Sequence, residues 1–391
     1  MPRLYRLAFL AQLTVAVMLL GSGAPLAGSA TAELPSRLTD QEFWRLTVDL
    51  SEPNGVFGSD NLLSNELVFA RIVPSLVERT KPGGVYLGVG PEQNFTYIAA
   101  MKPRMAFITD IRRGNLHLQL MYKALFELSA DRAEFVSRLF TKPRPTGLTL
   151  SSTATELMNA YWDAHTANEA AYLANLESIQ KQLTRTHDLP LSPEDLDGIA
   201  RVYRAFYWYG PRMNYAANTA LIPRRSTAES EALLAAYADV DYWSLMTQGN
   251  DAGQGLSYLA SEDQFMFLKD LESRNLIVPV VGNFTGAKAL RAIGTYVRTR
   301  GATIGAFYVS NVEMYLRRDD TWPAFCANAA TLPLDETSLF IRPTFSTNAM
   351  TIRNEDGTVM TSYRPNPAGS SPGVGLFSIT AEVKSCTAAA R

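Results

Sequence analysis

Short, continuously apolar runs alternate with stretches of helical periodicity along much of the chain. Such runs are typical of parallel strands that are buried on both faces of a sheet, and the helices between them would cover those faces. The runs predict five strands, at residues 85–89, 105–109, 256–260, 276–282 and 303–309. The helical patterns that follow them lie at residues 94–101, 116–128, 262–274, 286–300 and 322–330.

Further elements are predicted on either side of this alternation. Thr39 and Glu42 have the spacing of a capping box, which predicts a helix over residues 39–50. A second helix is expected at residues 62–78, with a kink at Pro74. Two more strands, which bring the total to seven, are predicted at residues 339–342 and 376–384.

Residues 130–255 interrupt the alternation with patterns that are almost all helical. We interpret this segment as a helical insertion that could act as a lid. It is rich in aromatic residues between positions 201 and 215, a density typical of core packing, with a substrate cleft as the alternative. The expected divisions are a leader (1–32), an N-terminal helical segment (33–84), two halves of one α/β domain (85–129 and 256–391) and the insertion between them.

The first 32 residues have the pattern of a secretory signal peptide. Arg3 and Arg6 precede an uncharged apolar run over residues 7–20, and Ala30-Thr31-Ala32 resembles a cleavage site. The run is shorter than the ~20 residues that cross a bilayer. We therefore expect an exported protein, periplasmic or secreted, without a membrane span after cleavage. An uncleaved anchor is the alternative.

The mature chain would be weakly acidic. Loss of residues 1–32 leaves 34 basic and 38 acidic residues, a formal charge of −4. Adjacent basic residues occur only as pairs, whereas phosphate binding needs a concentrated basic surface. Nucleic acid is therefore not expected as a partner.

The chain has two cysteines, Cys326 and Cys386. In an oxidising compartment a lone pair of this kind is expected to form a disulfide. The bond would close a loop of about 60 residues, worth ~4 kcal/mol in the chain-entropy account. Two unrelated buried thiols are the alternative.

Candidate chemistry lies where the first predicted strand meets its helix. Gly88 and Gly90 would let the backbone turn sharply, so that N–H groups at the helix start could face a ligand. Asp110 follows the second strand, where a carboxylate can accept both hydroxyls of a ribose. Gln93 stands where a dinucleotide fingerprint has its third glycine, so a nicotinamide-dependent oxidoreductase is the least favoured function.

The order of elements and this turn resemble the class I S-adenosylmethionine-dependent methyltransferases, which have a Rossmann-like, seven-stranded sheet. The resemblance implies a cofactor loop at residues 87–92, a ribose contact at Asp110 and adenine contacts at residues 260–263. It places Asn283 near the reacting methyl group. The cofactor-binding residues that it implies are Gly88, Gly90, Glu92, Asp110, Ile111, Ser261, Glu262 and Asn283.

The chain departs from that pattern at two places. Glu92 stands at the usual third glycine, and Tyr86 and Leu87 stand where an acidic residue often precedes the loop. The family's last strand is antiparallel and lies beside the fifth, which would bring Cys386 close to Cys326.

Nearly all of the mature length also resembles an uncharacterised bacterial protein family. The segments that carry this likeness are SDNLLSNE, YLGVGPEQNFTYIAA, DIRRGNL and VPVVGNFTGAKALRAIG.

Other candidates are the polar residues ahead of the first strand and the histidines. The polar residues could line a substrate cleft, although a helix-entry turn has the same composition. His117, His165 and His187 are far apart on helical patterns, so no metal site is expected. The substrate candidates are Asp60, Asn61, Asn65 and Glu66.

Two functions follow from these observations. The first is transfer of a methyl group from S-adenosylmethionine to an unknown acceptor, mostly by alignment of the reactants. The alternative is a non-catalytic protein that binds a small molecule or associates with the envelope and keeps the Rossmann-like fold. Export favours the alternative, because the periplasm is not expected to supply that cofactor.

Overall fold

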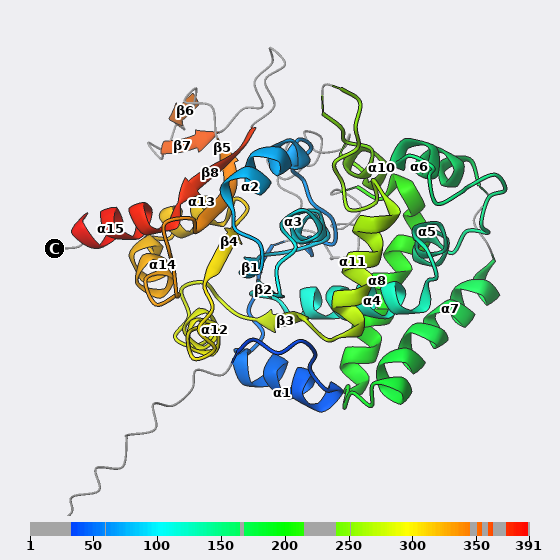
Figure 1. Ribbon diagram of the computed structural model, residues 1–391, viewed down its shortest axis with the longest axis horizontal. Coiled ribbons are helices and arrows are strands. Elements are labelled where there is room, and N and C mark those ends of the chain that lie inside the picture. The colour runs from blue at the N-terminus through cyan, green and yellow to red at the C-terminus, as the bar shows by residue number, and fades with distance from the viewer. Residues whose placement is uncertain are drawn as a thin grey trace, which may run out of the picture. The chain divides into compact units, whose positions relative to one another are not determined.

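A mixed, mostly parallel sheet of six strands forms the centre of the α/β fold, in the order β3-β2-β1-β4-β5-β8 (Figure 1). The computed structural model describes residues 33–58, 60–164, 168–214, 240–250, 252–344, 350–353, 359–362 and 373–389. Five strands of the sheet are parallel, and β8 is antiparallel beside β5. The strands are β1 (Val85–Gly88), β2 (Met105–Asp110), β3 (Ile277–Val281), β4 (Ile304–Tyr308), β5 (Leu339–Thr344) and β8 (Gly373–Ser378).

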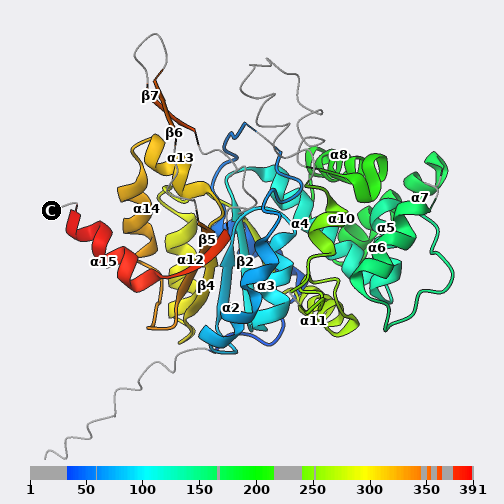
Figure 2. The same cartoon turned by 90° about the horizontal axis from the view of Figure 1, so that it is seen from above.

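Helices cover both faces of the sheet, as continuously apolar strands require (Figure 2). All residues of β1, β2, β3 and β4 are buried. One face carries α12 (Ala289–Arg298), α13 (Val312–Arg318) and α14 (Trp322–Ala329), and α1 (Asp40–Leu50) packs against β3 and α12. The other carries the helices α2 (Val73–Arg79), α3 (Gln93–Met101), α4 (Arg113–Leu128) and α11 (Glu262–Ser273).

The predicted helical insertion packs against α4, mainly through α5, α7 and α8. Aromatic side chains fill this contact, for example Phe126 against Phe135 and Tyr122 against Phe206. The described elements of this segment are α5 (Arg132–Phe140), α6 (Ala154–Asp163), α7 (Glu169–Lys181), η2 (Gln182–Thr186), α8 (Pro193–Tyr209), η3 (Gly210–Arg212) and α10 (Tyr242–Met246).

Local signals set several element boundaries as expected. The capping box of α1 forms, with Thr39 Oγ1 accepting from the Glu42 N–H at 3.2 Å and the Glu42 carboxylate accepting from the Thr39 N–H at 2.8 Å. The first, second and predicted fourth and fifth strands are present within one or two residues of their expected ends. The last strand, β8, is antiparallel, as the resemblance implied, but it lies beside β5, which was predicted as the sixth strand, and not beside the predicted fifth strand, which is β4.

The prediction of seven strands is wrong, because residues 256–260 do not join the sheet. Their polar groups find other partners: the Tyr258 N–H donates to Thr96 Oγ1 at 3.1 Å, and Ser257 Oγ donates to the Met246 carbonyl at 2.6 Å. Tyr258 is buried against Phe95 of α3 instead. Short apolar runs can be buried by side-chain packing alone, so periodicity does not identify them as strands. The third strand of the sheet is β3, which was expected as the fourth.

Two other element predictions need correction. Residues 62–68 are not helical; the chain forms η1 (Phe69–Ile72) and then α2, in whose first turn Pro74 lies instead of kinking a longer helix. The run at 376–384 ends as a strand at Ser378, whose Oγ accepts from the Ala381 N–H at 3.3 Å and so begins α15 (Ile379–Ala389). A separate two-stranded hairpin consists of β6 (Met350–Arg353) and β7 (Val359–Ser362).

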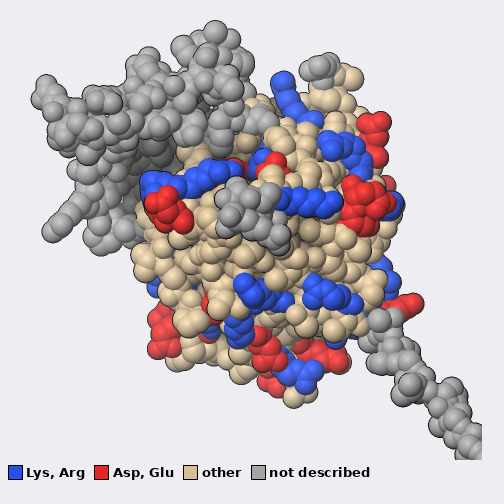
Figure 3. Space-filling view, turned by 90° about the vertical axis from the view of Figure 1, so that its left-hand side faces the viewer, with Lys and Arg blue, Asp and Glu red and all other residues tan. Residues whose placement is uncertain are grey.

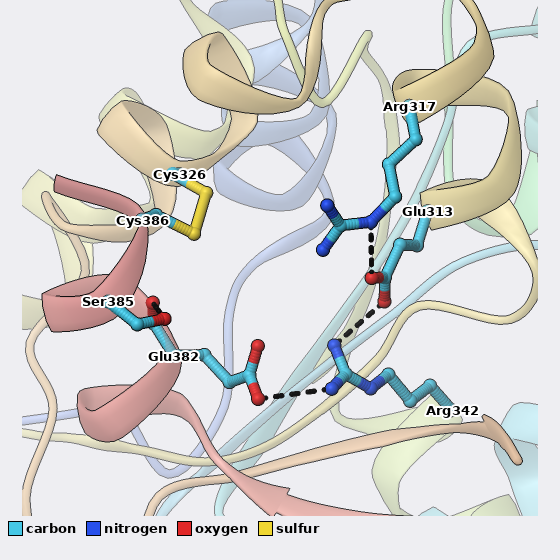
Figure 4. Close-up of a disulfide and its surroundings, with 7 residues drawn as sticks. All are labelled: Glu313, Arg317, Cys326, Arg342, Glu382, Ser385 and Cys386. Atoms are coloured by element: carbon cyan, nitrogen blue, oxygen red, sulfur yellow. Dashed lines mark hydrogen bonds and ion pairs between the residues drawn. A yellow bond between two sulfur atoms is a disulfide. The ribbon is translucent and has the colours of Figure 1, made fainter. Parts of the chain in front are cut away.

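A disulfide joins Cys326 of α14 to Cys386 of α15, with the two Cα atoms 6.0 Å apart (Figure 4). Because Cys386 lies on a helix and not on the last strand, the bond links two helices. Arg342 of β5 bridges the same region, with ion pairs to Glu313 at 2.7 Å and to Glu382 at 3.1 Å (Figure 4). The disulfide and the ion pair between Arg342 and Glu382 therefore both attach the C-terminal helix to the rest of the fold.

Some expectations fall outside the described residues. These are the signal peptide at 1–32, His165 and part of the aromatic segment near Tyr215. Among the helices that are described, none combines the length and apolar character that a membrane span requires. On the face seen in Figure 3, basic and acidic side chains are interspersed.

Candidate functional site

The turn between β1 and α3 is held together by the side chain of Asn94. Asn94 Nδ2 donates to the carbonyls of Val89 at 2.9 Å and Pro91 at 2.7 Å, and its Oδ1 accepts from the Tyr86 hydroxyl at 2.9 Å. A Cβ on Gly88 would overlap the Asn94 side chain. Glycine at position 88 therefore makes room for this amide.

Gly90 has a different role in the turn. Its φ of +79° lies in the left-handed region, where only glycine is unstrained. Gly90 is buried, yet a Cβ placed on it would meet no atom of the described chain within 4 Å, apart from its two neighbours. An open space therefore lies inside the protein beside this residue.

Glu92 points into the protein beside this turn. Its side chain is fully buried, and Oε1 accepts from the Ser64 N–H at 3.3 Å. Oε2 has no hydrogen-bond partner. Burial raises the pKa of Glu92 to about 8, so the group holds a proton at neutral pH. Burial raises the pKa values of the nearby hydroxyls of Tyr122, Tyr242 and Tyr258, and the charge of an ionised Glu92 would raise them further.

Two amides of α4 are also only partly hydrogen-bonded. Gln119 Nε2 donates to the Gly90 carbonyl at 3.1 Å, while its Oε1 is buried without a partner. Asn115 lies one turn earlier on the same helical face, and its Nδ2 is likewise buried without a partner. We call Glu92, Asn115, Gln119 and the space beside Gly90 the glycine-turn site. Sequence reasoning missed both amides, although polar residues four apart on a largely apolar helix were a usable signal.

Asp110 lies at the end of β2 and is paired with Arg112. Arg112 donates to Asp110 Oδ1 from its backbone N–H at 2.9 Å and from Nε at 3.1 Å, and to Oδ2 from Nη2 at 3.1 Å. Arg112 also donates to the carbonyl of Asp60. Both side chains of the pair are buried. Three of the sites at which this carboxylate could accept a ribose hydroxyl are thus filled by protein.

Glu66 forms a second polar cluster between the ends of β1 and β4. Its Oε1 accepts from the Tyr308 hydroxyl at 2.8 Å and from Ser310 Oγ at 2.7 Å. Its Oε2 accepts from Gln93 Nε2 at 3.0 Å, and Ser64 Oγ donates to Gln93 Oε1. Removal from water raises the pKa of Glu66 above its ordinary value, against the effect of these donors.

The structure brings some of the predicted site residues together and separates others. Six of them lie at the carboxyl edge of the sheet, where they make the contacts given above: Gly88, Gly90, Glu92, Asp110, Asp60 and Glu66. Ile111 is there as well, where its carbonyl accepts from the Gly55 N–H at 2.8 Å. Asn61 and Asn65 are half-buried within the segment that carries Ser64.

Three implied cofactor residues have other local roles. Asn283 follows β3, where its Oδ1 accepts from the Thr285 N–H at 3.0 Å. Ser261 caps α11, since its Oγ accepts from the Gln264 N–H at 3.3 Å, and Glu262 pairs with Arg132 of α5 at 3.3 Å. Because residues 256–260 are not a sheet strand, Ser261 and Glu262 do not follow a strand end as the resemblance implied.

The two described histidines are engaged by carboxylates. His117 Nε2 lies 2.8 Å from Asp195 Oδ1, and His187 lies between Asp40 at 2.6 Å and Glu127 at 2.5 Å. Within the described ranges, no His, Cys, Asp and Glu side chains are grouped so as to hold a metal ion.

A family profile matches residues 62–195 and 223–365, which is well over half of the chain. The family is described as a domain of unknown function (DUF7790). The chain belongs to this family. No curated protein matches the chain. The two matched ranges of this family together contain the glycine-turn site, Asp110 and the Glu66 cluster, so these features lie within the family's domain.

Proposed function

We propose that this protein binds a small polar ligand at the glycine-turn site. The observation that carries the proposal is that three of the buried side-chain polar atoms without a hydrogen-bond partner belong to this site: Glu92 Oε2, Asn115 Nδ2 and Gln119 Oε1. A buried polar atom without a partner costs about 1–3 kcal/mol, and native proteins contain few of them. A ligand that bonds to these three atoms would supply the missing partners.

The three atoms define the chemistry of that ligand. Gln119 Oε1 accepts, because the bond from Nε2 to Gly90 fixes the amide orientation. Asn115 Nδ2 donates, and protonated Glu92 can also donate from Oε2. A neutral molecule with hydroxyl or amide groups, able both to donate and to accept, would satisfy this set.

The topology supports ligand binding at this edge. The strand order reverses direction between β1 and β4, since β2 and β3 extend one way and β5 the other. In open α/β sheets, ligands bind outside the carboxyl ends of the strands at such a switch point. The β1–α3 turn adjoins this point.

S-adenosylmethionine-dependent methyl transfer is the second candidate. The strand order with an antiparallel strand beside β5 favours it. The residues fit the cofactor only in part: Asp110 would have to exchange bonds from Arg112 for ribose hydroxyls, and Glu92 lies in the loop that the cofactor approaches. No catalytic step is assigned to this candidate.

Native mass spectrometry of the protein, purified from a bacterial periplasm, tests the primary proposal. We expect the wild-type chain to carry a small molecule and the double variant Asn115→Leu/Gln119→Leu to be free of it. Gln41→Leu, an exposed change on α1, serves as the control and should retain the molecule. Calorimetry with S-adenosylmethionine, on wild type and Asp110→Ala, tests the second candidate.

The proposal fails if wild type is empty and the double variant is more stable than wild type. That result would mean that the unpartnered atoms are only unfavourable packing, which leucine relieves. A heat of S-adenosylmethionine binding to wild type that is absent in Asp110→Ala would instead favour the methyltransferase.

A further inference from the structure

Ser310 stands in an unusual backbone conformation directly after β4. It lies in the short connection to α13, and its φ of +48° is in the left-handed region that non-glycine residues rarely adopt. Residues held in this way cluster at active sites and ligand clamps. Ser310 is only half-buried.

The Ser310 hydroxyl is bonded to a carboxylate that has no cationic partner. Ser310 Oγ donates to Glu66 Oε1 at 2.7 Å, and the other donors to Glu66 are the neutral groups of Tyr308 and Gln93. No Lys or Arg of the described ranges forms an ion pair with Glu66. A carboxylate that is removed from water and lacks a cation is a stronger base than one in a salt bridge.

We propose that Ser310 is a nucleophile that takes an acyl group from a small ester, with Glu66 as its general base. As Ser310 Oγ forms a bond to the carbonyl carbon, its proton moves to Glu66 Oε1. The ester C–O bond then breaks, and the departing alkoxide takes that proton. Water attacks the acyl-serine, gives its proton to Glu66, and Ser310 recovers a proton as the acid leaves.

The position of this pair in the fold favours a reacting group. Ser310 follows β4 and Gln93 begins α3 after β1, so Glu66 bridges the two strand ends between which the strand order reverses. Nucleophilic serines on α/β sheets are presented on sharp strand-to-helix turns, since these project the hydroxyl from the sheet edge. The Ser310 pair does not depend on the ligand proposed for the glycine-turn site, although a hydrogen-bonded path through Gln93 and Ser64 joins the two.

An alkyl fluorophosphonate, which transfers its phosphorus to an activated serine with loss of fluoride, tests the proposal. The mature, disulfide-bonded chain is incubated with the probe, and the labelled peptide is located by mass spectrometry. We expect one adduct, on Ser310. We also expect a burst of nitrophenol from p-nitrophenyl acetate, because that ester would acylate the same oxygen.

Two variants separate a nucleophile from a merely structural serine. Ser310→Ala should abolish the adduct, and Glu66→Gln should slow labelling at least about a hundredfold, since a general base typically contributes 10²–10⁴ in rate. Ser178→Ala is the matched control, because Ser178 is half-buried but donates to the Ala174 carbonyl at 2.8 Å. A folded wild-type chain without an adduct on Ser310, or a Glu66→Gln chain labelled as fast as wild type, overturns the proposal.

Discussion

Glu92 and Asp110 are two carboxyl groups at one edge of the sheet whose surroundings differ sharply. Asp110 is paired with Arg112, whose guanidinium and backbone N–H together supply three hydrogen bonds. Glu92 receives one backbone hydrogen bond and no cation, so burial determines its protonation. One edge of the sheet therefore carries a buried carboxyl group that holds a proton at neutral pH and another that is paired with an arginine.

The titration of Glu92 makes stability depend on pH. Its pKa is about 8 in the folded chain but near 4.5 when unfolded, so the folded state retains a proton that the unfolded state loses between these values. This contribution is complete below about pH 4.5, falls as the pH rises, and is lost above about pH 8, with a total on the order of 5 kcal/mol. Urea unfolding at several pH values should show the free energy of unfolding falling across this range. In Glu92→Gln the slope of that free energy against pH should be smaller by the equivalent of about one proton.

Two comparisons make this prediction specific. Glu272 is also buried with a pKa raised to about 8, so Glu272→Gln should flatten the same pH range. Glu156 lies in an exposed capping box that lowers its pKa, so Glu156→Gln should leave the slope between pH 5 and 8 unchanged. An unchanged slope in Glu92→Gln would show that Glu92 is ionised in the folded protein.

Helices and strands were predictable here wherever a local signal set their ends. The Thr39 capping box and the glycine turn are examples, because each acts within a few residues. Residues 256–260 and 376–384 were mispredicted because an apolar run specifies burial but not the partner that buries it. Tyr258 packs on α3, and the chain after Ser378 turns into a helix whose Ile379 is buried.

The disulfide between α14 and α15 is expected to contribute to the stability of the fold. Cys326 and Cys386 are separated by 60 residues, and a loop of that length is worth ~4 kcal/mol of stability by chain entropy. Denaturant unfolding with and without dithiothreitol should differ by up to that amount. Cys326→Ala/Cys386→Ala should match the reduced protein and not respond to reductant. Identical midpoints for oxidised and reduced wild type would contradict the prediction.

The chain as a whole combines an α/β domain, a helical insertion packed on α4 and an N-terminal leader pattern. The disulfide is consistent with export, since such bonds persist in oxidising compartments. The described helices do not include a membrane span. The expectation of export rests on residues 1–32, whose pattern resembles that of a signal peptide.

Expression of the full sequence in a bacterial host tests export. We expect the protein in the periplasmic fraction with an intact mass that starts at Glu33, because Ala30 and Ala32 supply the small residues that signal peptidase requires. Ala32→Arg should block cleavage and leave the longer chain attached to the membrane. A full-length wild-type chain in the cytosol would refute the leader.

The sequence alone determined the α/β class, most strand and helix positions, the cysteine pair and the glycine turn. These follow from periodicity, capping and backbone freedom, which act over short stretches of chain. The partners of buried side chains were decided by the tertiary structure: the pairing of Asp110 with Arg112, the lack of a partner for Asn115 Nδ2 and Gln119 Oε1, and the bond from Ser310 to Glu66. Some of these contacts join residues that are distant in sequence, and others depend on the direction in which a side chain points. Packing around the sheet determines which of them form.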